Sequence, residues 1–203
     1  MKNNKPISFY AFEMLYWCGI RLGELLALTK SDFDFEASTV SITKSYQKLD
    51  GRDVITDPKT PKSKRVITMP DFLSEEMQEY INSLYGLKKD DRLFLFTKSY
   101  LHHEIDRGSK EKGIKRIRVH DILHSHVSLL IELGFTPVAI AERMGHESID
   151  MTLYYAHMFP AKQKEMAEKL ALERNDKNVE EGKGREKPLA EQGGSIQNVP
   201  RGE

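Results

Sequence analysis

The spacing of apolar positions in the first part of the chain predicts two helices. Large apolar side chains recur there at intervals of three and four residues, which is the period of one helix face. They are Phe9, Phe12, Tyr16 and Ile20. We expect a helix over residues 8–18, capped by Ser8 and broken by Gly19, and a second helix over the leucine-rich residues 21–29.

A change to alternating apolar and polar residues then predicts a small sheet. Residues 39–46 alternate in this way, as in a strand with one buried face. The Asp-Gly pair at residues 50–51 is typical of a hairpin turn. With residues 53–56 and 65–69 as the other strands, the pattern predicts one three-stranded antiparallel sheet.

Helical periodicity returns in the second half of the chain. We expect one helix that begins at Pro70 and another that begins at Ser148. We also expect helices over residues 121–134, 136–144 and 160–174. The helix over residues 136–144 has the clearest local signals. Thr136 is a good N-cap, Pro137 suits the first helical position, and Gly145 is suited to end the helix.

Composition divides the chain near residue 175. Residues 176–203 hold five glycines, five aliphatic side chains and no aromatic residue. Such a stretch buries too little apolar surface to offset the entropy that is lost on ordering. We therefore expect a folded domain over residues 1–175 and a disordered polar tail over residues 176–203.

Charge and cysteine content exclude several classes of protein. No apolar run approaches the roughly 20 residues of a membrane helix, and residues 1–6 have no signal-peptide pattern. The single cysteine, Cys18, excludes an internal disulfide and zinc sites built from several cysteines. We expect a cytoplasmic protein without a membrane partner. Its 31 basic and 31 acidic residues cancel, so a DNA contact would depend on a local basic patch.

Two clusters of residues combine basic side chains with turn or loop residues. The first is Gly-Ile-Arg-Leu-Gly-Glu, in which Arg21 starts a helix and Glu24 follows on the same face. Taken alone, it is more typical of a surface ion pair than of a site. The second is the basic segment of residues 58–65, which is either a solvated loop or a phosphate contact in which one lysine donates a proton.

Two further clusters contain histidine. His120, His124 and His126 have a spacing that suggests a metal site. However, no glutamate or cysteine is placed to complete that site, and the first and last of these histidines lie well apart around a helix. The other cluster is a Gly-His pair ending in His146, with Tyr155 nine residues further on. Taken alone, the tyrosine would be a core or interface aromatic residue.

Together and in this order, the clusters resemble the catalytic domain of the tyrosine recombinases, the phage- and transposon-integrase family. The order is an arginine box, a hairpin lysine, an HxxR box, a GH box and then a tyrosine. The resemblance covers about residues 8–172 and is most specific over residues 124–146 and in the phrase MTLYYAH. It implies an α+β fold, with a mainly helical tyrosine-recombinase catalytic core and a small three-stranded antiparallel sheet.

The resemblance also implies an enzyme that breaks and rejoins DNA without a metal or other cofactor. A tyrosine attacks the scissile phosphate and becomes linked to it as a 3′-phosphotyrosine. Arginines and histidines stabilise the charge that develops on the phosphate oxygens. A lysine on the hairpin protonates the departing 5′ oxygen, and the tyrosyl ester keeps the energy needed for rejoining.

The family's functional residues can be placed on this chain one by one. The catalytic positions correspond to Arg21, Lys59, His120, His146 and Tyr155. Lys62 is the rival of Lys59, because hairpin lengths vary. Glu24 and Asp121 match positions that support the catalytic residues from behind.

One catalytic position departs from the family pattern. The second arginine belongs at position 123, where this chain has Leu123, a residue with no donor and no charge. Arg116 and Arg118 precede the expected helix, so they should contact DNA, as should Lys62, and not replace that arginine. Loss of one transition-state donor costs on the order of 10²–10³ in rate, and we therefore expect impaired cleavage. The alternative function is that of a non-catalytic DNA-binding remnant of a mobile-element integrase.

The remaining expectations concern partners. The family acts on double-stranded DNA as a tetramer that exchanges a C-terminal segment, so we expect self-association on DNA and a monomer without it. We expect the family's N-terminal DNA-clamping domain to be absent, which should make DNA binding weak and salt-sensitive. A more distant interpretation is a metal-dependent hydrolase that uses His120, His124 and His126.

Overall fold

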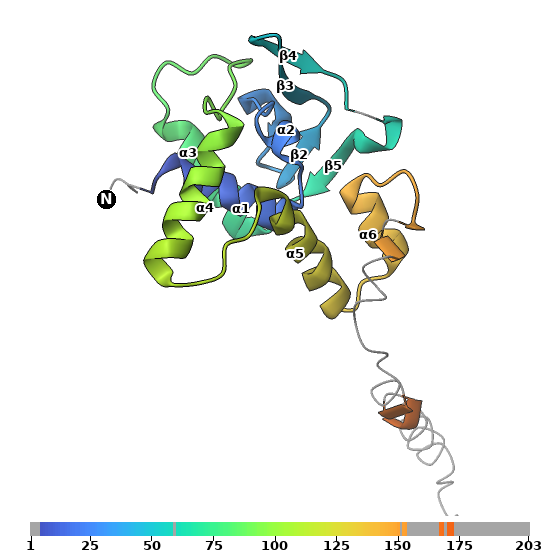
Figure 1. The fold of residues 1–203 in the computed structure, drawn as a ribbon. Helices are drawn as coiled ribbons and strands as arrows, with labels where there is room; N and C mark the ends of the chain where they lie inside the picture. Colours follow the sequence, from blue (N-terminus) through green and yellow to red (C-terminus); the bar gives the residue numbers. More distant parts are fainter. Residues whose placement is uncertain (1–4, 59, 151, 154–166, 169, 173–203) are drawn as a thin grey trace, which may run out of the picture. The chain divides into compact units, whose positions relative to one another are not determined.

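The computed structural model describes residues 5–58, 60–150, 152–153, 167–168 and 170–172. By its internal contacts the chain divides into two compact units, Met1–Phe159 and Pro160–Glu203. All of the helices and strands named below belong to the first unit (Figure 1). The domain boundary predicted near residue 175 and the tail after it lie outside the described residues.

Helix α1 (Ile7–Cys18) supplies much of the core. It agrees with the predicted helix, but Ser8 is not its cap: the Ser8 side chain is buried inside the first turn and donates a hydrogen bond to Glu104 at 3.1 Å. Gly19 ends the helix with a φ of 62°, as predicted. A Cβ atom at this glycine would lie 2.3 Å from Cδ2 of His126. Only glycine therefore allows the His126 ring to pack against this turn.

Helix α2 (Leu22–Leu25) is shorter than the helix predicted over residues 21–29. After α2 the backbone forms a tighter, 3-10-type turn, because the N–H groups of Ala27 and Leu28 bond to carbonyl groups only three residues back. The leucines of this segment are buried on all sides and do not form one apolar stripe. Their spacing alone could not distinguish a helix from a buried turn. A short 3-10 turn, η1 (Lys30–Asp32), follows.

The first unit contains a three-stranded antiparallel sheet, as predicted, but its strand order is β1-β2-β5 and β1 was not among the predicted strands. The strands are β1 (Phe33–Asp34), β2 (Thr39–Ile42) and β5 (Arg65–Thr68). In the register of β2 with β5, Ile42 lies opposite Arg65 and Thr39 lies opposite Thr68. This pairing places the start of β5 next to the end of β2.

The assignment of residues 53–56 to that sheet is wrong. Strand β4 (Arg52–Thr56) pairs with β3 (Ser45–Leu49) in a separate two-stranded sheet. The predicted strand over residues 39–46 is interrupted at Lys44, whose ammonium group lies 2.9 Å from the buried carboxylate of Asp32. This contact between distant residues anchors the chain where it leaves the first sheet, and the sequence pattern did not reveal it.

Over the described residues up to Gly145, four helices follow the sheets. They are α3 (Asp71–Ser83), α4 (Lys98–Lys112), α5 (Val119–Glu132) and α6 (Pro137–Met144). The bounds and caps of α6 are as predicted, with Thr136 accepting a hydrogen bond from the Ala139 N–H at 3.2 Å. Helix α4 is missing from the prediction, because only Leu101 among its residues is buried. Asp150, Thr152 and Leu153 are helical, whereas most of the helix predicted over residues 160–174 lies outside the described residues.

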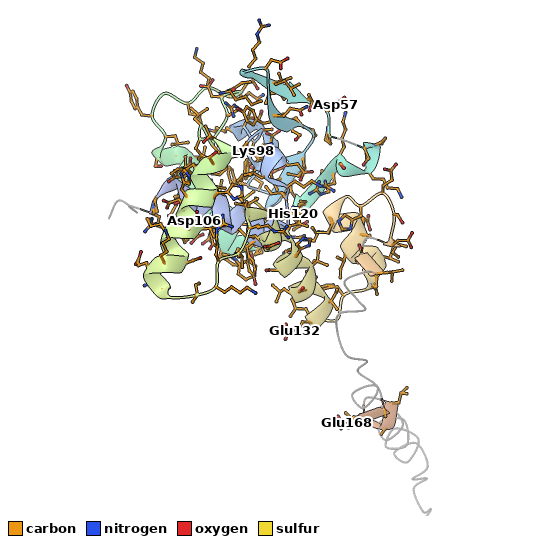
Figure 2. The ribbon with its side chains drawn as sticks, in the orientation of Figure 1. Asp57, Lys98, Asp106, His120, Glu132 and Glu168 are labelled. Atoms are coloured by element: carbon orange, nitrogen blue, oxygen red, sulfur yellow. The ribbon has the colours of Figure 1, made fainter. Side chains whose placement is uncertain are left out.

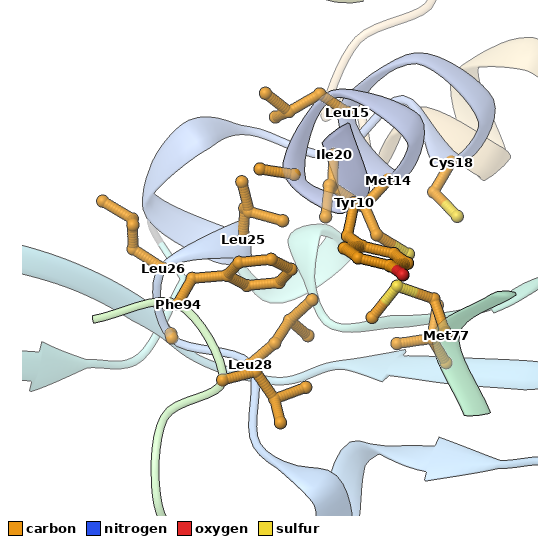
Figure 3. Packing of buried hydrophobic residues seen from close by; sticks show 14 of the residues in the cluster. Tyr10, Met14, Leu15, Cys18, Ile20, Leu25, Leu26, Leu28, Met77 and Phe94 are labelled. Carbon is orange, nitrogen blue, oxygen red and sulfur yellow. The ribbon is translucent and has the colours of Figure 1, made fainter. Parts of the chain in front are cut away.

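The apolar side chains form a large core and a small satellite cluster. Figure 3 shows Phe94 beside Leu25 and Leu26, and Tyr10 beside Met77, in the large core. The satellite cluster consists of Leu123, Val127, Ile140 and Met144, from α5 and α6. Among the described residues, no helix is long and apolar enough to cross a membrane. The α+β architecture, a mainly helical body with a small sheet, is confirmed.

Candidate functional site

The centre of the candidate site is the buried carboxylate of Glu24, which is only 3% exposed. Oε1 accepts hydrogen bonds from Nη1 of Arg21 at 2.7 Å and from Nη1 of Arg65 at 3.3 Å. Oε2 accepts from the Arg21 backbone N–H at 2.9 Å and from Nη2 of Arg65 at 3.0 Å. Burial raises the pKa of Glu24, but the bonds and charges of the two arginines outweigh burial and lower it. Glu24 is therefore an ionised carboxylate with a full set of donors.

Arg21 is held at the start of α2 with part of its side chain open to solvent. It occupies the N-cap position, and 37% of its side chain is exposed. In the described part of the chain, its guanidinium makes one hydrogen bond, to Glu24. A guanidinium has five N–H donors in a planar fork, so the remaining donors can bind an anion such as phosphate.

The loop that precedes β5 packs against the turn after α6. Its 3-10 turn, η2 (Pro61–Ser63), places Nζ of Lys62 at 3.1 Å from the Glu147 carbonyl and Oγ of Ser63 at 3.5 Å from the Gly145 carbonyl. Gly145 has a φ of 63°, and a Cβ there would lie 2.9 Å from the Lys62 carbonyl oxygen. The basic loop and the Gly-His turn are therefore in direct contact. Lys59, the first choice for the hairpin lysine, lies outside the described residues.

His146 follows that glycine and is buried, with 5% of its surface exposed. Its Nδ1 lies 2.9 Å from the hydroxyl of Thr152, which is fully buried. Burial lowers the pKa of His146, and the positive charges of Arg21 and Arg65 lower it further. The imidazole is therefore neutral near pH 7. When Thr152 donates to Nδ1, the ring proton is on Nε2, where it can be donated to an anion.

A groove adjoins His146 between β5 and α6 and has a volume of about 760 Å³. Its basic lining residues are Lys62, Lys64, Arg65, Arg143 and His146. Val66, Val138 and Ile149 add apolar surface, and Glu142 and Glu147 add acidic side chains. The groove is therefore mixed in character, with its basic residues gathered from the loop, the strand and the Gly-His turn.

The start of α5 carries the other predicted residues (Figure 2). His120 is exposed, and its ring lies edge-on to His124 with 4.8 Å between the ring centroids. Asp121 accepts hydrogen bonds from the backbone and side chain of Arg118, and these bonds lower its pKa to about 2. In the described part of the chain, no hydrogen bond or ion pair joins His120 or Asp121 to the Glu24 site. Their predicted roles remain predictions.

The two arginines predicted to contact DNA already have carboxylate partners. Arg118 pairs with Asp121 at 2.8 Å, and Arg116 pairs with Asp106. All four side chains are at least partly exposed. DNA phosphates would therefore have to compete with these carboxylates for the arginines.

Leu123, which the resemblance predicts to stand at the position of the family's second arginine, is 7% exposed. It belongs to the satellite cluster, where its neighbours come from α5 and α6. One member, Met144, immediately precedes the Gly-His turn. An aliphatic side chain thus fills this position as part of a packed apolar group.

The three clustered histidines do not gather around a common point. His126 is 2% exposed, and its Nε2 lies 3.4 Å from Nε of Arg143. Burial lowers the pKa of His126 to about 4, and the charge of Arg143 contributes to the shift. Among the described residues, no group of three His, Cys, Asp or Glu side chains could hold a metal ion.

The structure thus joins Arg21 to Glu24 directly, and Arg65 connects Glu24 to the basic loop and to the end of α6. Lys62 and His146 line the same groove, whereas His120 and Asp121 have other neighbours. Tyr155 and Lys59 lie outside the described residues. Sequence reasoning assigned no role to Arg65 or Thr152. Arg65 was one of several basic residues in its segment, and its partner Glu24 is 41 residues earlier, too distant for a spacing rule to connect them.

The chain is similar to known integrases. The model of the phage integrase family matches residues 3–162. The ICEBs1 integrase of Bacillus subtilis strain 168 is 35% identical over 178 residues, which cover 80% of this chain and 48% of that protein. The integrase of Mycobacterium phage L5 is 24% identical over 168 residues, which cover 78% of this chain and 45% of that protein. The chain therefore spans about half the length of the curated relatives it matches.

Solved structures have the same fold. The Tn1549 transposon integrase in complex with circular intermediate DNA has a TM-score of 0.71 and 25% identity, covering 84% of this chain and 62% of that chain. The XerA recombinase has a TM-score of 0.61 and 22% identity, covering 80% of this chain and 57% of that chain. The likeness to XerA supports the fold alone.

Proposed function

The chain belongs to the phage integrase family of tyrosine recombinases, and on this premise we propose that residues 1–175 act as a recombinase catalytic domain that binds the phosphates of duplex DNA at the Glu24 site. One observation carries this proposal: the partly exposed Arg21 shares Glu24 with Arg65, and Arg65 bonds both to the basic loop, at Ser63, and to the helix end that precedes the buried His146. The fixed guanidinium of Arg21 and the neutral N–H donor of His146 are suited to stabilise a phosphate oxygen whose negative charge grows in the transition state.

In the proposed reaction, the Tyr155 hydroxyl releases its proton to solvent and its oxygen attacks the scissile phosphorus. The new phosphorus–oxygen bond is a 3′-phosphotyrosine, and the bond to the 5′ oxygen breaks. Lys59, or its rival Lys62, gives a proton to that oxygen. Arg21, His120 and His146 stabilise the charge on the non-bridging oxygens, and reversal of the step on a new strand completes rejoining. No cofactor takes part in this scheme.

We propose that strand cleavage is impaired in this chain. Leu123 has no donor, and its burial against α6 leaves it integrated in apolar packing. A transition-state donor is worth on the order of 10²–10³ in rate, so the lost arginine should slow cleavage by at least that amount.

The second candidate function is binding to DNA without cleavage. The observation that favours it is the close fit of Leu123 with Val127, Ile140 and Met144. A core that accommodates an aliphatic residue at a catalytic position is expected in a remnant that has kept its fold and lost its chemistry. The phosphate contacts of Arg21 and His146 would remain useful in such a protein.

The proposed partners are double-stranded DNA and further copies of the chain. Solved relatives include the Tn1549 integrase with circular intermediate DNA and the XerH recombinase bound to difH substrate. By analogy, we propose a tetramer on DNA and a monomer without it. Because Arg116 and Arg118 are paired with carboxylates, we expect binding to be weak. We also expect it to fall with salt, because each phosphate contact that does form releases counterions.

A covalent-trapping assay tests both functions. The chain is incubated with nicked duplexes drawn from the DNA that flanks its gene, so that a cleaved strand loses its 5′ end and cannot be rejoined. An adduct that survives denaturation and maps to Tyr155 supports the enzyme, and Tyr155→Phe should abolish it. Binding without adduct supports the second function. Absence of both binding and adduct would contradict both.

A further inference from the structure

Arg65 connects three segments of the candidate site, although it is not one of the predicted catalytic residues. Its side chain is 7% exposed and pairs with Glu24 at 3.0 Å. Its Nε donates to the Arg143 carbonyl at 2.8 Å, at the end of α6, and its Nη1 donates to the Ser63 carbonyl at 2.9 Å, in the basic loop. One guanidinium therefore ties together the arginine box, the hairpin loop and the helix that leads into the Gly-His turn.

The bonds to Glu24 also determine what remains free on Arg21. Both carboxylate oxygens are already occupied by Arg65, and Oε2 additionally accepts the Arg21 backbone N–H. The Arg21 guanidinium consequently reaches only Oε1, through Nη1 at 2.7 Å. A lone carboxylate would pair with an arginine through both oxygens, as a bidentate fork. Here Arg65 makes that fork, through Nη1 and Nη2, and the Arg21 guanidinium adds a single bond at Oε1.

We infer that Arg65 is a positioning residue of the phosphate site: by sharing Glu24, it prevents Arg21 from closing on that carboxylate and leaves the Arg21 donors free for DNA. The inference rests on the proposed function and adds a residue to it. Without Arg65, Glu24 would have Arg21 as its only charged partner, and Arg21 would turn toward it. The anion-binding donors would then be consumed inside the protein.

A purely structural ion pair would behave differently, and Arg92 provides the comparison. Arg92 also joins distant segments, because it donates to the Leu26 carbonyl at 3.3 Å and pairs with Asp53 at 2.9 Å. Its guanidinium stacks over the Tyr46 ring at 4.2 Å. These partners carry none of the candidate catalytic side chains. Arg92→Lys is therefore a matched control for loss of an arginine cross-link.

The test uses the full chain with isotope labels on arginine and histidine. Inorganic phosphate is titrated while the Arg21 Nε–H and His146 ring signals are followed by NMR. Arg65→Lys keeps the charge but cannot hold three segments at once. We expect it to weaken phosphate binding by about tenfold to a hundredfold, the worth of one charge-assisted hydrogen bond, and Arg92→Lys to leave the affinity within about twofold.

A double-mutant cycle separates positioning from direct contact. If Arg65 acts through Arg21, Arg65→Lys should change phosphate affinity little once Arg21→Gln is present. If the two losses simply multiply, Arg65 acts on its own and the inference is overturned. Equal losses for Arg65→Lys and Arg92→Lys would overturn it as well, because both would then reflect a general loosening of the fold.

If the proposed function is wrong, the NMR titration gives a different result from the one expected if only the role of Arg65 is wrong. In that case the Arg21 and His146 signals of the unmodified chain would not move with phosphate. The relaxation of the Arg21 Nε–H group would still decide the role of Arg65, since Arg65→Lys must change it and Arg92→Lys must not. Should Arg65→Lys not fold, Arg65→Gln combined with Glu24→Gln removes the buried carboxylate together with its partner. If Arg65 acts by sharing Glu24, this double variant should show the same Arg21 relaxation as Glu24→Gln alone, and a further change would overturn the inference.

Discussion

Arginine–carboxylate pairs occur in two regions of the first unit, and the regions differ in how far water reaches the charges. At the Glu24 site, the carboxylate is buried and Arg65 is 7% exposed, and backbone groups from three segments complete the network. At the start of α5, Arg118 and Asp121 are 70% and 28% exposed, and Arg116 pairs with Asp106 in a similar setting. The same chemical pair thus serves as a fixed scaffold in one region and as a replaceable contact in the other.

Burial explains the difference. A buried ion must keep all its partners, because water cannot replace a lost one. An exposed pair gains little, since water and salt compete for both charges. A phosphate can therefore displace Asp106 or Asp121 from an arginine, but it cannot displace Glu24. In the proposed complex at the Glu24 site, DNA would use only the donors that the network leaves free.

The largest expected effect is on stability, from breaking the buried network. Glu24→Gln leaves Arg21 and Arg65 without their carboxylate and should lower the free energy of unfolding by about 3–5 kcal/mol. Asp106→Asn, at the exposed pair, should cost far less. Urea denaturation of both variants measures the difference. Equal losses would show that burial does not distinguish the two regions.

The next effect is on cleavage and concerns Leu123, which lies on the helix that carries the exposed pair. Leu123→Arg restores a donor where charge develops, so covalent adduct should rise by roughly 10²-fold or more with a much smaller gain in DNA affinity. A charged arginine cannot remain packed against Val127 and Ile140 in the apolar cluster, so we also expect a lower free energy of unfolding. Trapping assays, DNA titrations and urea denaturation of the variant test the three parts. Equal gains in adduct and affinity would mean that the arginine anchors the ground state.

The sequence predicted best what is decided locally. Helix α6 was predicted to the residue because Thr136 and Gly145 cap it through neighbouring groups. The resemblance to the family brought Arg21 and His146 together, although they are far apart along the chain. The exchange of strand partners at Lys44 and the pairing of Arg65 with Glu24 depend on contacts between distant residues. No periodicity or cap encodes such contacts.

Two helix-ending glycines give a smaller and closely matched test. Gly145, beside the site, and Gly113, at the end of α4, have φ values of 63° and 64°. Alanine at either position suffers the left-handed strain of about 1–2 kcal/mol. At Gly145, its Cβ would also lie 2.9 Å from the Lys62 carbonyl oxygen, whereas at Gly113 it would meet open space. Gly145→Ala should therefore lower the melting temperature more than Gly113→Ala, and should alone weaken phosphate binding.

The exposed region should respond to charge removal with a gain. Asp106→Asn frees Arg116 from its carboxylate partner, so DNA affinity should rise a few-fold at low salt and the salt dependence should steepen. Fluorescence anisotropy with a labelled duplex at several salt concentrations measures both quantities. Glu24→Gln is the comparison from the buried region, where removal of the carboxylate should weaken binding because Arg21 loses its support. A gain in both variants would mean that only net charge governs DNA binding.

The smallest expected effect is a dependence on pH, and at His146 its two parts have opposite signs. Burial and the nearby arginines lower the pKa of His146 in the folded state below the ordinary value of about 6.5. The unfolded chain therefore binds more protons, and the stability that His146 contributes is complete above pH 6.5 and is lost as the pH falls through the lowered pKa. DNA phosphates remain ionised over this range, and in the proposed complex protonation of His146 would add a positive charge beside them. Affinity for DNA should therefore rise a few-fold as the pH falls below about 6.5, while stability declines.

His146→Gln should abolish the rise in affinity but keep much of the decline in stability. The reason is that His126, with a pKa of about 4, also makes the folded protein less stable as the pH falls. A pH-dependent affinity that persists in His146→Gln would assign the protonation to another group and remove His146 from the phosphate site.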